Sequence, residues 1–189
     1  MDKVLNLIIL GPQGSGKGTQ AELLAKKLNA ALFGAGDALR EIAREDTELG
    51  RQVHETINVQ GRLVAPELIS QVMKEKIDSV PKDQHLILDS YPRSLEQYGF
   101  FNRFWPDTGR EDYQVLFIVL SETEAVKRLM LRKRLDDTED AIRQRLDLFK
   151  TTTLPMIKEM GQGGRFIEIN GDQSIEAVQE EILEKLNLS

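Results

Sequence analysis

A glycine-rich turn near the start of the chain constrains the fold more than any other feature of the sequence. Residues 11–17 read Gly-Pro-Gln-Gly-Ser-Gly-Lys, which matches the spacing G-x-x-x-x-G-K of a phosphate-binding loop. An apolar run at residues 4–10 precedes this loop and a helical pattern starts at Lys17. Backbone N–H groups of such a loop surround phosphate oxygens, and the following helix points its positive end at the same anion. The alternative is a turn without a ligand, and the strand-like run directly before the loop argues against it.

Short apolar runs alternate with longer stretches of helical period along the chain. This alternation predicts an α/β fold, in which helices cover both faces of a parallel sheet. The expected strands are residues 4–10, 31–33, 86–88, 115–120 and 166–169. The expected helices are residues 17–28, 37–43, 47–59, 65–77, 94–104, 123–134, 138–160 and 175–186. Because the second crossover is longer than one connection needs, we expect residues 34–64 to form an inserted subdomain within a single core of residues 1–189.

The composition argues against several classes of partner and site. The formal net charge of −6 at pH 7 argues against a general affinity for nucleic acid or for an anionic membrane. The chain has no cysteine, which excludes disulfides and a cysteine-ligated structural zinc site. No apolar run reaches the length of a membrane span, and no signal-peptide pattern is present. We therefore expect a cytoplasmic protein that is a monomer by default.

Polar and charged residues follow the second and third expected strands. Asp37 and Arg40 lie after the second strand, and Asp89, Arg93 and Gln97 lie after the third. In an open parallel sheet the carboxyl ends of the strands meet at one crevice, so these residues should lie near the phosphate loop of residues 11–17. A carboxylate at that place suits magnesium, which takes one or two carboxylates and keeps much of its hydration.

Further arginines occur late in the chain. Arg128 and Arg132 are four residues apart and share a helix face, although a single arginine on a helix is most often a solvated surface charge. Phosphoryl transfer between two phosphate anions needs several fixed cations around the moving group and no general base. The cations that could provide this charge are Lys17, Arg40, Arg93, Arg132, Arg134 and Arg145.

Five segments resemble, in order and spacing, the motifs of adenylate kinase and its nucleoside monophosphate kinase relatives. They are GPQGSGKGTQ, GAGDALR, GRLVAPEL, LDSYPRSLEQ and RLDDTEDAIRQRL, and the resemblance runs from residue 4 to about residue 178. The resemblance implies a P-loop NTPase fold with strand order 2-3-1-4-5, a mobile AMP-binding subdomain and a mobile lid. It also implies reversible transfer of the γ-phosphoryl group of Mg-ATP to AMP, which gives two ADP.

The resemblance assigns residues to four roles. The ATP-binding residues would be Gly14, Ser15, Gly16, Lys17, Gly18, Thr19, Arg132 and Gln173. The AMP-binding residues would be Ala35, Arg40, Arg62, Leu63, Val64, Ser90, Tyr91, Pro92, Arg93, Gln97, Arg134 and Arg145. The catalytic residues would be Lys17, Arg93, Arg128, Arg132, Arg134 and Arg145, and Asp89 and Thr19 would serve magnesium.

The sequence departs from the family pattern beside the acceptor nucleotide. Gly34-Ala35-Gly36 replaces a usual Ser-Thr-Gly, and Ser90-Tyr91 replaces a usual Gly-Phe before Pro-Arg. These changes bear on specificity, so another monophosphate kinase that accepts CMP, UMP or dAMP stays open. Gln97 favours AMP because its amide can pair with an adenine edge. A non-catalytic nucleotide-binding regulatory protein is a further alternative, against which the set of lysine, aspartate and arginines argues.

The lid is the largest departure from the family pattern. Only Lys133 separates Arg132 from Arg134, where the family has a loop or a small domain, so an almost lidless enzyme with a vestigial lid at residues 132–134 is expected. Water must then be kept from the γ-phosphate in another way. One hypothesis is closure of the AMP-binding subdomain, and a second is cover by another subunit.

Overall fold

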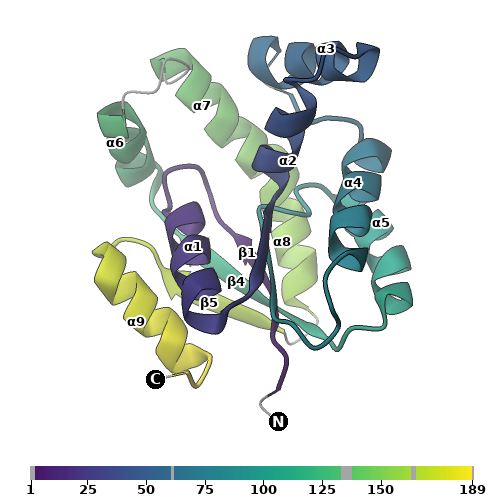
Figure 1. Cartoon of the computed structure of the whole chain (residues 1–189). Coiled ribbons are helices and arrows are strands. Elements are labelled where there is room, and N and C mark those ends of the chain that lie inside the picture. Colours follow the sequence, from purple (N-terminus) through teal and green to yellow (C-terminus); the bar gives the residue numbers. More distant parts are fainter. Residues whose placement is uncertain (1–2, 61, 133–137, 163–164, 189) are drawn as a thin grey trace.

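A twisted sheet of five parallel strands forms the centre of the molecule (Figure 1). The computed structural model describes residues 3–60, 62–132, 138–162 and 165–188, without the side chains of Asn58 and Arg132. The strands are β1 (Asn6–Leu10), β2 (Ala31–Gly34), β3 (Leu86–Asp89), β4 (Tyr113–Val119) and β5 (Phe166–Asn170). Their order is β2-β3-β1-β4-β5, which confirms the predicted α/β fold and its strand order.

Helices connect the strands, and the predicted helices are confirmed to within a few residues, except that the predicted end of the helix at residues 133–134 lies outside the described residues. They are α1 (Lys17–Leu28), α2 (Ala35–Ile42), α3 (Glu48–His54), α4 (Pro66–Asp78), α5 (Leu95–Phe104), α6 (Glu122–Arg132), α7 (Glu139–Leu148), α8 (Leu154–Gly161) and α9 (Ile175–Lys185). A 3₁₀ turn, η2 (Trp105–Thr108), follows α5. Two π-helical turns were not predicted: η1 (Glu55–Val59) extends α3, and η3 (Phe149–Thr153) joins α7 to α8.

Local sequence signals fix where several helices begin. The side chains of Thr47, Ser94, Thr138 and Ser174 each accept a hydrogen bond from the backbone N–H three residues later. These hydroxyl groups satisfy N–H groups that have no partner inside the first turn of a helix. Among the helices that the structure describes, none is long and apolar enough to cross a lipid bilayer.

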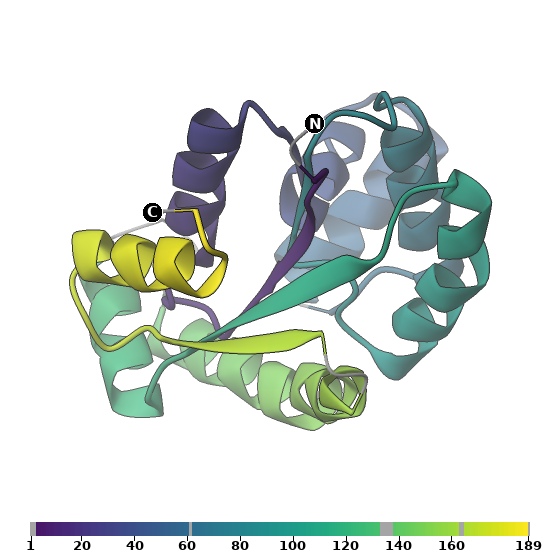
Figure 2. The same cartoon turned by 90° about the horizontal axis from the view of Figure 1, so that it is seen from below.

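Side chains that alternate along the central strand β1 build one core on each face of the sheet. Helices cover both of these faces (Figure 2). Leu7 and Ile9 of β1 pack in the cluster that contains Leu24 of α1 and Ile182 of α9. Ile8 and Leu10 instead belong to the cluster with α4, α5 and α8. Both faces of the strand are buried because successive side chains of a strand point to opposite faces.

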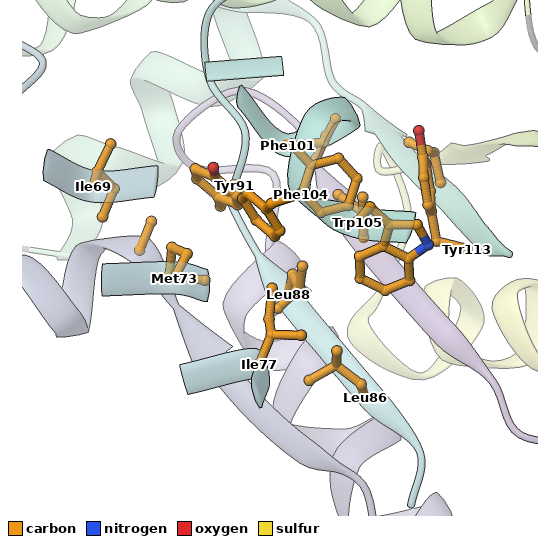
Figure 3. Close-up of a cluster of buried hydrophobic side chains, with 14 of the residues drawn as sticks. Ile69, Met73, Ile77, Leu86, Leu88, Tyr91, Phe101, Phe104, Trp105 and Tyr113 are labelled. Carbon is orange, nitrogen blue, oxygen red and sulfur yellow. The ribbon is translucent and has the colours of Figure 1, made fainter. Parts of the chain in front are cut away.

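Aromatic side chains fill the centre of the larger core (Figure 3). Phe101 is fully buried and its ring packs against those of Tyr91, Phe104, Trp105 and Tyr113, with centroids 5.0–6.0 Å apart. Most of these contacts are edge-on, the arrangement that the ring quadrupoles favour. Tyr91, two residues after the end of β3, belongs to this cluster and thereby anchors the segment that follows β3.

The interval of residues 34–64 carries α2, α3 and η1 and lies beyond the carboxyl end of β2 (Figure 1). Ala35, Leu39, Val53 and Val64 are buried and belong to the same core as α4, α5 and α8. A separate, mobile subdomain over these residues stays a prediction. The predicted vestigial lid at residues 132–134 lies outside the described residues, apart from the backbone of Arg132.

Candidate active site

The phosphate loop of residues 11–17 connects β1 to α1 in a strained but glycine-compatible conformation. Gly14 and Gly16 both have φ of +83°, in the left-handed region that other L-residues rarely adopt. A Cβ atom at Gly14 would lie 3.0 Å from the carbonyl oxygen of Ala125, so the loop also packs closely against α6. The predicted glycines are therefore required by backbone conformation and by packing.

The polar groups of this loop face inward. The Lys17 Nζ atom folds back over the loop and donates to the carbonyl oxygen of Pro12 at 3.2 Å. The Ser15 hydroxyl oxygen is buried and has no hydrogen-bond partner within the described part of the chain. A buried polar atom without a partner is costly, so a ligand with polar oxygens fits the loop. The loop also suits an anionic ligand because the backbone N–H groups and the positive dipole end at the N-terminus of α1 lie beside it.

Asp89 ends β3 beside the phosphate loop. It pairs in register with Ile9 of β1, and its Oδ2 atom lies 3.6 Å from the position that a Cβ atom of Gly18 would take. In the described segments, no group of three His, Cys, Asp or Glu side chains could hold a metal ion by itself. A single carboxylate at a phosphate site fits magnesium, which binds through one or two carboxylates and substrate phosphates. Thr19, the second predicted magnesium residue, is exposed on the first turn of α1.

A pocket beside β3 brings together residues from five segments of the chain. We call it the Arg93 pocket; its lining residues are Ala35, Leu39, Ile57, Arg62, Leu63, Val64, Ile69, Arg93 and Gln97. Six of the residues predicted to bind AMP are in this set: Ala35, Arg62, Leu63, Val64, Arg93 and Gln97. The structure therefore brings these residues to one place, although their spacing along the chain spans more than half of the first hundred residues.

Arg93 is held by three hydrogen bonds in this pocket. Its Nε atom donates to the Ser90 carbonyl oxygen and its backbone N–H donates to Gln97 Oε1, both at 2.8 Å. Its own carbonyl oxygen accepts from the Thr153 hydroxyl at 2.8 Å. Burial lowers the pKa of Arg93, the nearby charge of Asp89 opposes that shift, and Arg40 adds to it. The guanidinium is thus a fixed, partly desolvated cation that is influenced by the charges of both Asp89 and Arg40.

Arg40 approaches the same site from α2. Its guanidinium pairs with Asp37, one turn earlier on the helix, and both side chains are largely exposed. A Cβ atom at Gly36 would lie 3.1 Å from Arg40 Nη1, so the absence of a side chain at Gly36 makes room for the guanidinium. An exposed pair of this kind contributes little to stability, which leaves Arg40 able to exchange Asp37 for another anion.

Arg128 holds the loop of residues 171–173, which lies on the predicted ATP side. We call it the 171–173 loop. Arg128 donates to the carbonyl oxygens of Gly171 at 3.0 Å and Gln173 at 3.4 Å, and its Nε atom bonds to Glu124 at 2.9 Å. The bond to Arg128 lowers the pKa of Glu124. Gln20 of α1 also holds this region through the Ile175 carbonyl at 2.9 Å. These contacts give Arg128 a positioning role, while the predicted catalytic role stays a prediction.

The remaining predicted residues differ in burial, and two of them are not fully described by the structure. Tyr91 is fully buried and donates its hydroxyl hydrogen to Ser70 Oγ at 2.9 Å, so its side chain faces the core and only its backbone is available to a nucleotide. Pro92 is buried beside it, and Arg145 lies partly buried on α7. Arg134 and the side chain of Arg132 lie outside the described residues.

Sequence reasoning missed several residues of the site. Leu39, Ile57 and Ile69 line the Arg93 pocket, and Leu39 could have been found because it lies one helical turn after Ala35. Thr153 had no such signal, since it contacts Arg93 across sixty residues of chain.

Comparison with known proteins agrees with this geometry. The family model described as adenylate kinase matches residues 9–164. Adenylate kinase 1 of Nostoc sp. is 36% identical over 176 residues, covering 93% of this chain and 95% of that protein. The adenylate kinases of Prochlorococcus marinus (strain AS9601) and Corynebacterium urealyticum are 34% and 32% identical, over 96% and 95% of this chain and 98% and 97% of those proteins.

The chain belongs to the adenylate kinase family. Membership in this family makes it a nucleotide-binding phosphotransferase with a P-loop NTPase fold. The reaction of the family is reversible phosphoryl transfer, in which ATP and AMP give two ADP. Adenylate kinases carry out this reaction with ATP, AMP and ADP as substrates and products.

Proposed function

We propose that the phosphate loop holds Mg-ATP, that the Arg93 pocket holds AMP, and that the γ-phosphoryl group passes between them. The observation that carries this assignment is the joint position of Ala35, Arg62, Val64, Arg93 and Gln97 around one pocket. A pocket lined by a fixed arginine and a buried amide suits a nucleotide with one phosphate. The charge of Asp89 acts on that arginine, and its Oδ2 atom lies close to Gly18, directly after the phosphate loop.

In the forward reaction a phosphate oxygen of AMP attacks the γ-phosphorus of ATP. The bond between that phosphorus and the β,γ-bridging oxygen breaks, and ADP leaves with the electron pair. The attacking oxygen is already anionic, so no residue needs to remove a proton. Charge spreads over the moving group, and Lys17, Arg93 and Arg145 would neutralise it together with Arg132 and Arg134.

Magnesium fits the donor side of the site. Asp89 would hold the ion, directly or through its water, and Thr19 would contribute its hydroxyl. Bound magnesium would neutralise charge on the ATP phosphates and orient them. We expect the protein to act as a monomer in the cytoplasm, without nucleic acid or membrane partners.

Specificity for AMP is supported by the position of Gln97. Its side chain is buried, and its Oε1 atom accepts from the Arg93 N–H group, which fixes the amide so that Nε2 is a donor on the pocket side. Adenine presents ring-nitrogen acceptors to such a donor, whereas the corresponding ring nitrogen of uracil carries a hydrogen. Ala35 supplies no hydroxyl to a base, which leaves Gln97 as the main source of base recognition.

The test is ADP formation from ATP and magnesium with AMP, dAMP, CMP or UMP as the acceptor. We expect kcat/KM to be at least roughly 10-fold higher for AMP than for UMP, because the Gln97 donor would meet the ring N–H group of uracil and stay unpaired. Gln97→Leu should remove most of this difference, and Gln71→Leu, an exposed glutamine on α4, is the matched control. Equal use of CMP or UMP would favour a different monophosphate kinase, and no ADP with any acceptor would favour a regulatory protein.

A further inference from the structure

Ser90 occupies the short stretch of chain between the two halves of the site. Its hydroxyl donates to Asp89 Oδ1 at 2.7 Å, and its carbonyl oxygen accepts from Arg93 Nε at 2.8 Å. Its backbone N–H donates to the Ile9 carbonyl at 3.0 Å, directly beyond the last paired residues of β1 and β3. One buried residue therefore contacts the carboxylate beside the phosphate loop and the arginine of the Arg93 pocket.

The backbone of Ser90 lies in a conformation that serine rarely adopts. Its φ of +62° is in the left-handed region, which is uncommon for residues other than glycine and asparagine. A glycine would adopt this φ without the steric cost, and glycine is the residue of the family pattern at this place. Residues held in such conformations persist where the surrounding structure requires them, and they cluster at functional sites.

The Ser90 hydroxyl bonds to one oxygen of the Asp89 carboxylate, and the other oxygen lies near Gly18, directly after the phosphate loop. Rotation of a carboxylate about its last torsion is soft, so a hydrogen bond to one oxygen restricts the direction of the other. In this structure Oδ1 is bonded to Ser90, and Oδ2 lies 3.6 Å from the position of a Cβ atom at Gly18. Among the described residues Oδ2 has no hydrogen-bond partner, and it lies near Gly18, directly after the loop proposed to receive the ATP phosphates.

We infer that Ser90 is a positioning residue that orients the Asp89 carboxylate toward the metal ion of Mg-ATP. The inference rests on the proposed role of Asp89 toward magnesium and extends it to a residue that does not touch the ion. A hydrogen bond from a neighbouring group fixes the direction in which a ligating oxygen points, and loss of such bonds commonly lowers metal affinity by 10–100-fold. The carbonyl of the same residue holds Arg93, so the two phosphate sites share one rigid support.

The experiment measures metal affinity rather than turnover. Mn²⁺ replaces Mg²⁺ as a paramagnetic probe, and its binding to the complex of the full-length protein with a non-hydrolysable ATP analogue is followed by electron paramagnetic resonance. Ser90→Ala keeps the Cβ atom and the strained backbone but removes the hydroxyl, and Ser90→Gly removes the hydroxyl and relieves the backbone. We expect both variants to weaken Mn²⁺ binding by roughly 10-fold, with the affinity for the analogue alone unchanged.

Ser79→Gly is the matched control, because within the described residues the Ser79 hydroxyl bonds only to the Lys76 carbonyl, at the end of α4 and away from the phosphate loop. This variant should bind Mn²⁺ as the parent protein does. Parental affinity in both Ser90 variants would overturn the inference, and so would weakening in Ser90→Ala alone, because that result would trace the effect to backbone strain.

Asp89→Asn separates this inference from the proposed function beneath it. If Asp89→Asn weakens Mn²⁺ binding while the Ser90 variants do not, Asp89 serves the metal and only the role of Ser90 fails. If Asp89→Asn leaves Mn²⁺ binding unchanged, the role of Asp89 toward the metal fails and the role of Ser90 fails with it. Circular dichroism and melting of each variant identify any loss of fold.

Discussion

Thr153 donates its hydroxyl hydrogen to the backbone carbonyl of Arg93, with 2.8 Å between the two oxygen atoms. Thr153 is the last residue of the π-helical turn η3, which interrupts the long helix formed by α7 and α8. A π turn inserts an extra residue into the helix and thereby changes which side chains face a neighbouring element. In this protein the turn directs a threonine at the segment that carries the pocket arginine.

Thr153→Val is expected to damage the acceptor side selectively. The variant keeps the shape of the side chain but leaves the Arg93 carbonyl without this donor, which should cost about 1–2 kcal/mol of stability. Arg93 would lose one of its three supports, so the KM for AMP should rise several-fold while the KM for ATP stays within about 2-fold. Steady-state kinetics with each nucleotide varied in turn, and urea unfolding, measure both effects.

Thr153→Ser is the control for this prediction, since it restores the hydroxyl and should return the KM for AMP toward the parent value. An equal rise of both KM values in Thr153→Val would mean that Thr153 supports the fold in general rather than the acceptor side.

Lys17→Met should abolish most of the turnover and preserve the fold. The variant keeps the length of the side chain and removes the only lysine of the phosphate loop, whose charge would stabilise the moving phosphoryl group. We expect kcat to fall by roughly 10²–10³-fold, as for removal of one fixed group at a developing charge. Lys26→Met changes an exposed lysine of the same helix and should be neutral. Near-parental kcat in Lys17→Met would remove Lys17 from the reaction.

Arg128→Gln should weaken the binding of ATP and leave the binding of AMP unchanged. Arg128 bonds the carbonyl oxygens of Gly171 and Gln173, so the shorter side chain would release the 171–173 loop. The KM for ATP should rise about 3–10-fold, corresponding to roughly one lost charged hydrogen bond, with the KM for AMP unchanged. Lys127→Gln is the control because Lys127 also pairs with Glu124, at 3.2 Å, and is largely exposed. A fall in kcat at unchanged KM would instead assign Arg128 to the transferring group.

Tyr91→Phe should alter how stability depends on alkaline pH. Burial raises the pKa of Tyr91 from 10.0 to about 12, so the folded protein resists an ionisation that the unfolded chain undergoes above pH 10. The raised pKa means that the parent protein loses stability as the pH rises from 10 toward 12. At pH 11 that loss is about 1.4 kcal/mol.

The phenylalanine variant has no phenol to ionise at this position, so its unfolding free energy should fall less between pH 8 and pH 11, by about that amount. Urea unfolding of both proteins at the two pH values measures the difference, and the comparison cancels the contribution of other tyrosines. Parallel losses in the two proteins would show that the Tyr91 phenol is not resistant to ionisation in the folded state.

Much of the fold followed from local sequence signals. The five apolar runs became the five strands because strands buried on both faces need continuous apolar sequence. Helix starts were equally local, since Ser94 and Thr138 are caps that act within one turn. The phosphate loop was predictable because its glycines are required by a φ of +83° at Gly14 and Gly16.

Other parts of the site had no local signal. The π turns add one residue to a helix without changing the apolar pattern, so the contact of Thr153 with Arg93 could not be anticipated. Serine has no marked preference for the left-handed region, so the φ of +62° at Ser90 depends on its tertiary contacts. The reach of Arg128 to Gly171, forty-three residues away, likewise depends on how α6 and the end of β5 meet.

The two cores on either side of the sheet hold different parts of the site. Among the described residues, the buried apolar side chains of the interval 34–64 belong to the core that contains α4, α5 and α8. Helix α1, which follows the phosphate loop, packs with α9 in the other core. A shift of α2 and α3 would therefore disturb one core and spare the other. In the proposed arrangement, substitutions that reshape the acceptor pocket would leave the packing of α1 in place, so a change of acceptor specificity would need no compensating change beside the donor nucleotide.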